Sequence, residues 1–150
     1  MPLADSHRLV IREASLSDAS RIAELSGQLS YPTEQAAVER SMRVLPQDGS
    51  HVVFVAEDGA GRVVGWAHVY ALHFVGSDMR AEVAGLVVDE SCRRSGVGIA
   101  LMARVEDWAR EKGLPAVTLR SNVIREPAHK FYEKLGYTRI KTQHAFRKIL

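Results

Sequence analysis

The chain has a single cysteine, Cys92, among its 150 residues, so no internal disulfide can form and a reducing compartment suits it. No apolar run approaches the ~18 residues that a membrane-spanning helix needs. The first residues lack the apolar segment of a secretory signal. The formal net charge of +2 is too small, and the basic residues too dispersed, to argue for a nucleic-acid partner. We therefore expect a cytoplasmic protein with neither a membrane nor a nucleic-acid partner.

What is present is the composition of an ordinary globular domain, with 46% hydrophobic and 25% charged residues. A chain of this length can bury a core without disulfides or metals, so we expect one domain over residues 1–150. The order of apolar runs and turns is β-α-α-β-β-β-α-β-α-β. It predicts a mixed α/β fold with one twisted, mostly antiparallel sheet flanked by helices. The expected strands lie at residues 9–11, 52–56, 63–74, 81–88 and 116–119, with one or two closing strands in 137–150.

The short turns between the strands at 52–56, 63–74 and 81–88 predict an antiparallel meander. A helix from Val97 to Lys112 separates the strand at 81–88 from the one at 116–119. A strand, helix and strand in succession predict that these two strands pair in parallel.

The most informative stretch is residues 93–98, Arg-Arg-Ser-Gly-Val-Gly, between the apolar strand ending at Val88 and the helix starting at Val97. The first N–H groups of a helix have no partner within it, and the helix dipole adds partial positive charge there. Glycine lets a bulky phosphate approach the backbone closely. This stretch therefore predicts a site for a phosphate-bearing ligand.

Two common phosphate-binding motifs do not fit this stretch. The P-loop requires a lysine and a serine or threonine directly after its second glycine, and no such sequence occurs. The dinucleotide motif requires a third glycine where this chain has Leu101. A nucleotide-binding domain of another kind is left as a weaker alternative.

A third pattern, Arg/Gln-x-x-Gly-x-Gly/Ala, is matched in full by residues 93–98. In this motif and in its element order, the chain resembles the GNAT superfamily of acetyl-coenzyme A-dependent N-acetyltransferases over nearly its whole length. The resemblance implies that backbone amides of the turn hold the pyrophosphate of coenzyme A and that the pantetheine arm follows the preceding strand. Arg94 stands where the family commonly has glycine. The residues so assigned are Leu86, Val87, Val88, Arg93, Arg94, Ser95, Gly96, Val97, Gly98 and Ile99.

A second match lies in residues 122–137, which resemble the family's Asn…Ala-x-x-Phe-Tyr-x-x-x-Gly-Phe/Tyr segment. The resemblance implies that Asn122 contacts the coenzyme and that Tyr132 lies near its sulfur. Acetyl transfer leaves a thiolate that needs a proton, which a phenol can donate. Tyr132 is therefore the candidate catalytic acid, with packing in the core as the alternative role.

The attacking amine must lose a proton first, since a free alkylamine has a pKa of about 10.4. A base or a chain of water molecules must take that proton. Glu82 is the candidate base, because it begins the strand that leads to the turn. Histone acetyltransferases of the resembled family place a glutamate at a similar offset. A solvated carboxylate at a strand end is the alternative interpretation of Glu82.

The acceptor is implied to enter from the side opposite the coenzyme, among the first two helices, the strand around residues 66–70 and the C-terminal strands. His68 and Tyr70 alternate along their strand, so they share one face. No acidic cluster selects a polycation, so the acceptor is left open between a small-molecule amine and a peptide or protein amine. The candidate acceptor-side residues are Tyr31, Trp66, His68, Tyr70, Arg120 and His144.

Together these features predict an N-acetyltransferase that moves the acetyl group of acetyl-coenzyme A directly to a primary amine in a ternary complex. The spacing of the histidines fits no metal-ligand pattern, so we expect no metal. A non-catalytic acyl-coenzyme A sensor is the alternative, and it would not need Tyr132. Residues 143–150 alternate in character and could pair with the edge of a second copy, giving a homodimer.

Overall fold

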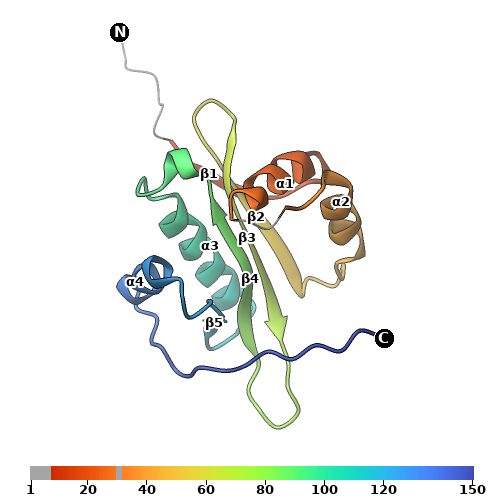
Figure 1. Cartoon of the computed structure of the whole chain (residues 1–150), viewed down its shortest axis with the longest axis vertical. Helices are drawn as coiled ribbons and strands as arrows, with labels where there is room; N and C mark the ends of the chain where they lie inside the picture. The colour runs from red at the N-terminus through yellow and green to blue at the C-terminus, as the bar shows by residue number, and fades with distance from the viewer. Residues whose placement is uncertain (1–7, 30–31) are drawn as a thin grey trace. The chain divides into compact units, whose positions relative to one another are not determined.

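The computed structural model describes residues 8–29 and 32–150, and the chain divides into two compact units, Met1–Leu119 and Arg120–Leu150. The larger unit contains a sheet, helices and two short 3-10 turns (Figure 1). Its strands are β1 (Val10–Glu13), β2 (His51–Glu57), β3 (Val63–Leu72), β4 (Arg80–Val88) and β5 (Val117–Leu119). Its helices are α1 (Ala19–Gly27), α2 (Gln35–Val44) and α3 (Val97–Glu111), and its 3-10 turns are η1 (Leu16–Asp18) and η2 (Glu90–Cys92).

The strands lie in the order β1-β2-β3-β4-β5. The first four pair antiparallel, and β5 pairs parallel to β4. A parallel pair needs a long crossover, and α3 supplies it between β4 and β5. The meander and the parallel pair predicted from the sequence are therefore confirmed, and so is the mixed α/β fold class.

Helices cover both faces of this sheet, with α1 and α2 on one face and α3 on the other (Figure 1). Successive strand residues point to opposite faces. Val55 accordingly packs into the core with Ile22 and Leu25 of α1, and it is fully buried. Its neighbour Phe54 lies beneath the Arg104 guanidinium of α3, at 4.6 Å from the ring centroid. We call these two surfaces of the sheet the α1 face and the α3 face.

Helix α3 packs on the sheet through an apolar stripe at helical spacing. Val97, Leu101, Val105 and Trp108 are all buried. On β3, Gly65 leaves room for this stripe, since a Cβ atom there would lie 3.0 Å from Val97 Cγ1. This packing fixes the first turn of α3 directly after the turn that leaves β4.

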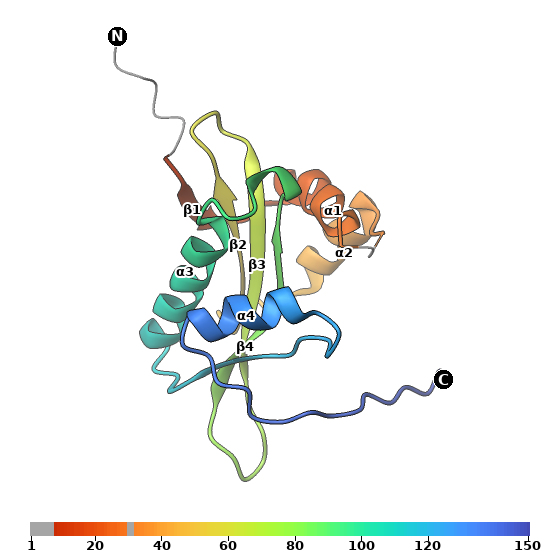
Figure 2. The ribbon, with the colours of Figure 1, turned by 60° about the vertical axis from the view of Figure 1, so that its left-hand side comes forward.

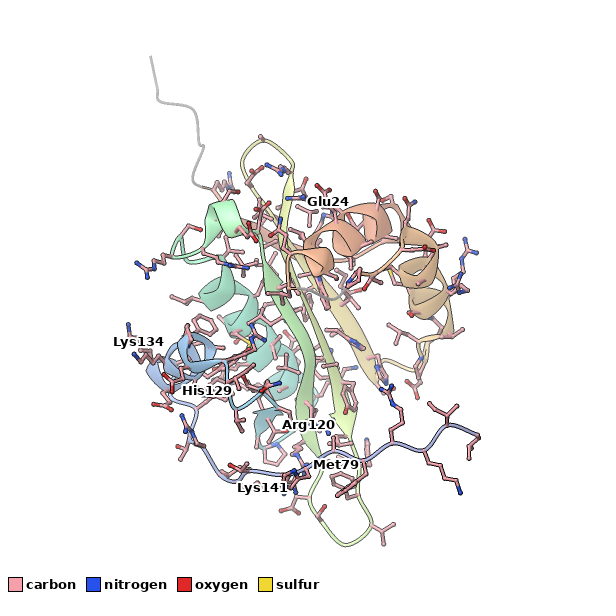
Figure 3. All side chains as sticks on the ribbon, viewed as in Figure 1. Glu24, Met79, Arg120, His129, Lys134 and Lys141 are labelled. Atoms are coloured by element: carbon pink, nitrogen blue, oxygen red, sulfur yellow. The ribbon has the colours of Figure 1, made fainter. Side chains whose placement is uncertain are left out.

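The smaller unit contains α4 (Glu126–Lys134), which carries His129 and Lys134 (Figure 3). Beyond α4 the chain continues without regular structure to its C-terminus (Figure 2). The prediction of closing strands in residues 137–150 is therefore wrong, because these residues form no strand. Their large apolar side chains are few and exposed, with Ile140 at 75% and Phe146 at 95%. A strand is held in a sheet mainly by the burial of one apolar face. Apolar and polar residues alternate here, but the apolar ones are too few to form such a face.

Within the described residues, no helix has both the length and the apolar character required to cross a lipid bilayer.

Candidate active site

The turn between β4 and α3 has an uncommon backbone. Arg94 and Gly96 have φ angles of 66° and 87°, in the left-handed region. Glycine adopts this region freely, whereas an arginine there is strained. Hydrogen bonds from the Cys92 N–H to the Asp89 carbonyl (2.9 Å) and from the Ser95 N–H to the Cys92 carbonyl (3.3 Å) hold the turn. Position 94, where the resembled family commonly has glycine, therefore has a backbone conformation that glycine adopts more easily than arginine.

The first turn of α3 is open to a ligand. Gly96 is its N-cap residue, and no side chain caps this end of the helix. A Cβ atom built on Gly96 meets no other atom within 4 Å. Arg93, Arg94 and Ser95 are exposed next to it. Open space, unpaired N–H groups and positive charge together suit a pyrophosphate.

The other predicted coenzyme contacts differ in what they can offer. Val97 is 2% exposed, so its side chain belongs to the core and only its backbone could serve a ligand, whereas Ile99 is 55% exposed. Val87 is likewise buried, in the core beneath α1. In the larger unit, β5 pairs with β4 only at residues 81–83, so Leu86–Val88 extend beyond this pairing. A ligand could therefore bind that strand edge through the backbone.

Just before this edge, β4 contains an irregularity. Val69 of β3 pairs with Val83 and His68 pairs with Gly85, so Ala84 is an extra residue in β4. A Cβ atom on Gly85 would lie 2.7 Å from Trp66 Cη2. The indole of Trp66 therefore covers the β4 backbone at Gly85, and only glycine leaves room for it.

Polar side chains from three adjacent strands meet on the α1 face, and we call His51, His68, Tyr70 and Glu82 the polar cluster. Tyr70 pairs in register with His51 on one side and with Glu82 on the other. Its hydroxyl donates to Glu82 Oε2 at 3.3 Å, and its ring stacks on His51 with centroids 5.0 Å apart. His51 Nδ1 lies 3.0 Å from His68 Nε2. The structure thus brings Glu82, the candidate base, together with the acceptor-side candidates His68 and Tyr70.

The burial of the polar cluster sets its electrostatics. Burial, with a smaller contribution from His51, lowers the pKa of His68 to about 4. His68 is therefore neutral at pH 7, and the two imidazoles can share one proton in their hydrogen bond. Glu82 is 6% exposed, and a buried carboxylate is costly unless a donor such as the Tyr70 hydroxyl satisfies it.

Sequence reasoning missed His51, because no motif distinguishes this first residue of an apolar run. The signal that could have found it is the register of the meander. With a short turn between the second and third strands, His51 falls opposite Tyr70, and a residue directly opposite on an antiparallel strand shares its face.

Two predicted site residues lie in the smaller unit. The Asn122 side-chain oxygen accepts the Ile124 N–H at 3.1 Å, and the Asn122 carbonyl lies 2.9 Å from His129 Nε2. These bonds fix the entry to α4. Tyr132 is half-buried, with its ring centroid 5.2 Å from that of Phe131. Burial raises the pKa of Tyr132, although the charge of Arg125 acts in the opposite direction.

The remaining acceptor-side candidates are distributed differently. Tyr31 lies outside the described residues. Trp66 packs against the core beneath α1, and among the described residues its buried Nε1 has no hydrogen-bond partner. Arg120 and His144 are exposed residues of the smaller unit. In the described part of the chain, no three side chains of His, Cys, Asp or Glu gather as metal ligands would.

A strand, a left-handed glycine turn and an uncapped helix, with a strand edge that β5 does not cover, are features that suit a long phosphate-bearing ligand. A profile of the Acetyltransferase (GNAT) family matches residues 17–137. The chain is 30% identical over 141 residues to an aminoglycoside N(6')-acetyltransferase type 1 of Stenotrophomonas maltophilia. The aligned region covers 91% of this chain and 91% of that protein. The chain therefore belongs to the acetyltransferase (GNAT) family.

Solved structures share this fold. An acetyltransferase of Trypanosoma brucei superposes with a TM-score of 0.76 at 29% identity, covering 94% of this chain and 100% of that one. The aminoglycoside N-acetyltransferase AAC(6')-Iy, solved in complex with coenzyme A, gives a TM-score of 0.82 at 21% identity, over 94% of this chain and 95% of that one. The protein is an N-acetyltransferase, and this finding favours the enzyme over the sensor that the sequence left open.

Proposed function

We propose that the protein transfers the acetyl group of acetyl-coenzyme A directly to a primary amine while both substrates are bound. The observation that carries this proposal is the open first turn of α3 at Gly96. Its N–H groups would hold the pyrophosphate, with residues 93–99 around it and the charges of Arg93 and Arg94 nearby. The Ser95 N–H is already donated to the Cys92 carbonyl, so the donors are the N–H groups that follow it. Binding of the pyrophosphate would need no metal, because backbone dipoles and cationic side chains supply the positive potential.

The edge of β4 would bind the remainder of the coenzyme. Leu86, Val87 and Val88 extend past the pairing with β5, so their backbone groups can bind the pantetheine amides like an added strand. A backbone N–H near Val87 or Val88 would also donate to the thioester oxygen as charge gathers there.

Glu82 would act as the general base. It lies on β4 only a few residues before that edge, on the α1 face. The Tyr70 hydroxyl orients its carboxylate through the hydrogen bond of 3.3 Å. A carboxylate in the acceptor's path can take the proton from the ammonium group, directly or through one water molecule.

Tyr132 would act as the general acid, and Asn122 as a contact to the coenzyme. The raised pKa of Tyr132 keeps the phenol protonated at neutral pH, which is the form that can protonate a departing thiolate. Because only the Asn122 side-chain oxygen bonds the Ile124 N–H, its amide NH₂ can still donate to a ligand.

The acceptor would bind along the α1 face, where Trp66, His68 and Tyr70 follow one another on β3. The polar cluster contains one carboxylate, Glu82, which is too little charge to hold a polycation by ion pairs alone. We therefore propose that the acceptor is a primary amine of a small molecule or of a peptide or protein. The cytoplasmic location, the lack of a metal, the homodimer and the single domain over residues 1–150 stay predictions from the sequence.

Calorimetry with coenzyme A tests the proposal at Gly96. The variant Gly96→Val places a branched side chain in the open space, and we expect the dissociation constant to rise at least thirtyfold. Gly113→Val is the matched control at the other end of α3. Gly113 also has a positive φ, 71°, and a Cβ atom there also meets nothing within 4 Å. The control carries similar backbone strain and should keep coenzyme affinity within about threefold. Equal affinities in the two variants would contradict the proposed pyrophosphate site.

A further inference from the structure

A buried carboxylate that takes no part in the proposed chemistry directly follows β4. Asp89 is 3% exposed. Its Oδ1 accepts hydrogen bonds from the N–H and the hydroxyl of Ser91, both at 3.0 Å. Its Oδ2 pairs with the guanidinium of Arg21, and Arg62 Nη2 lies 3.5 Å from the same oxygen. The carboxylate thereby caps η2, the 3-10 turn that leads into residues 93–96, which we call the pyrophosphate turn after their proposed role.

Arg21 connects this carboxylate to a helix and to a second strand. It lies on α1, and its Nε donates to the Val63 carbonyl of β3 at 2.8 Å. Its Nη1 also lies 3.1 Å from the carboxylate of Glu24, one turn further along α1 (Figure 3). Arg21 is therefore fixed by bonds to β3 and α1 at the same time as it holds Asp89.

A second bond joins the end of α1 to the same segment. The side-chain oxygen of Gln28 accepts the N–H of Glu90 at 2.9 Å. From there, the bonds from the Cys92 N–H to the Asp89 carbonyl and from the Ser95 N–H to the Cys92 carbonyl continue to the residue before Gly96. An unbroken series of hydrogen bonds thus runs from α1 to the start of α3.

Buried ion pairs of this kind contribute little net stability, because the desolvation of both charges offsets their attraction. They do favour one geometry, since each charge needs its partners in place. For Asp89, burial alone would raise the pKa, but the bonds from Ser91 and Arg21 outweigh it and hold the pKa below its usual value. The carboxylate is thus charged at neutral pH, and its partners fix where the turn begins.

We propose that Asp89 and Arg21 are positioning residues for the coenzyme, which tie the pyrophosphate turn to α1 so that its N–H groups converge on one point. This inference rests on the proposed function, because it takes the turn to be the coenzyme site. Neither side chain touches the coenzyme in this proposal. Loss of Asp89 should therefore weaken coenzyme binding through the position of the turn.

The variant Asp89→Asn tests this proposal, and the chain offers a matched control in Asp18→Asn. Asp18 is also a buried aspartate, 6% exposed, at a 3-10 turn. It pairs with Arg12 at 2.9 Å and accepts the Ser15 N–H at 2.8 Å. Both variants lose one charge of a buried ion pair, so both should lower the melting temperature. Only Asp89→Asn should raise the dissociation constant of coenzyme A, by tenfold or more, with Asp18→Asn within twofold.

Equal coenzyme affinities in the two variants, measured by calorimetry below both melting temperatures, would overturn the positioning role while leaving the proposed function intact. No binding of coenzyme A by the parental chain would overturn both.

A second pair of variants, with milder changes, tests the positioning role if Asp89→Asn does not fold. Gln28→Ala removes the acceptor of the Glu90 N–H, and Gln35→Ala removes an exposed hydrogen bond on α2. Gln28→Ala should raise the KM for acetyl-coenzyme A two- to fivefold with kcat nearly unchanged. A KM equal to that of Gln35→Ala would contradict the proposal.

Discussion

At the scale of single residues, Tyr132 combines a half-buried ring with a hydroxyl that stays protonated. Its raised pKa means that the neutral phenol persists well above pH 7. A phenol that stays protonated has a proton available when the C–S bond breaks and negative charge gathers on the sulfur. The same burial that packs the ring against Phe131 therefore suits the hydroxyl to its proposed task.

We expect Tyr132→Phe to lower kcat by about 10- to 100-fold, since a positioned acid contributes at least that much. The KM for acetyl-coenzyme A should change little, because the ring remains. The control is Tyr137→Phe, whose ring centroid lies 6.0 Å from that of Tyr132. This change also removes one phenol from the smaller unit, and turnover should stay within about twofold. If thiol-release assays gave the same kcat for both variants, water rather than Tyr132 would be the proton donor.

Single residues of the site differ in how far the sequence predicts them. Residues 93–98 are contiguous, so a sequence motif can single out the turn before α3, and the φ of 66° at Arg94 is one that glycine adopts freely. Glu82 and Tyr70 are far apart in sequence, and each was singled out for its own reason. Their hydrogen bond depends on the register of β3 against β4, including the extra residue Ala84. No local pattern encodes that register. His51 was missed for a different reason, because no motif marks the first residue of its apolar run.

At the scale of elements, the pairing of β3 with β4 depends on a glycine beneath an indole. We expect Gly85→Ala to lower the free energy of unfolding by about 1–2 kcal/mol, because its Cβ would lie 2.7 Å from Trp66 Cη2. Trp66 must then turn away, and Trp66 also lies on the proposed acceptor face. Urea unfolding measures the first effect, and the KM for the amine measures the second.

The control for Gly85→Ala is Gly27→Ala, in the last turn of α1. A Cβ atom on Gly27 meets nothing within 4 Å. Alanine is the better helix former, so this variant should gain about 0.5–1 kcal/mol. A loss of stability of the same size in both variants would show that the contact with Trp66 is not the cause.

Elements with a strong internal pattern were predictable, and the last segment was not. The stripe of α3 and the buried run of β4 each carry many apolar residues, which local periodicity reveals. Residues 138–150 alternate in a similar way, but most of their alternating positions are polar or charged. Whether such a segment becomes a strand depends on a partner, and sequence pattern alone does not supply one.

At the scale of the whole molecule, His68 makes stability depend on pH. Its pKa is about 4 in the folded chain, against an ordinary value of 6.5. Between those values the unfolded chain binds more protons than the folded one, so stability falls as the pH falls. The free energy of unfolding should drop by about 2 kcal/mol between pH 7 and pH 4.5 from this group. Above pH 7 its contribution is constant.

Urea unfolding at a series of pH values checks this expectation. His68→Gln keeps a polar side chain but does not titrate, so the slope between pH 7 and pH 4.5 should flatten. His73→Gln is the control, because His73 is exposed just after β3. It should retain the full slope. A variant at His68 with the parental slope would mean that the imidazole is protonated as readily in the folded chain as in the unfolded one.

The register across β2, β3 and β4 has a further consequence for how the chain can change in length. His51, Tyr70 and Glu82 face the same side only because each pair of strands is aligned residue by residue. One residue inserted within β3 would turn Trp66 and His68 to the face covered by α3. An insertion in the exposed loop at residues 73–79, which includes Met79 (Figure 3), leaves every pairing in place at a small entropic cost. Relatives of this chain can therefore differ in the length of that loop, while the lengths of the paired strands stay constant.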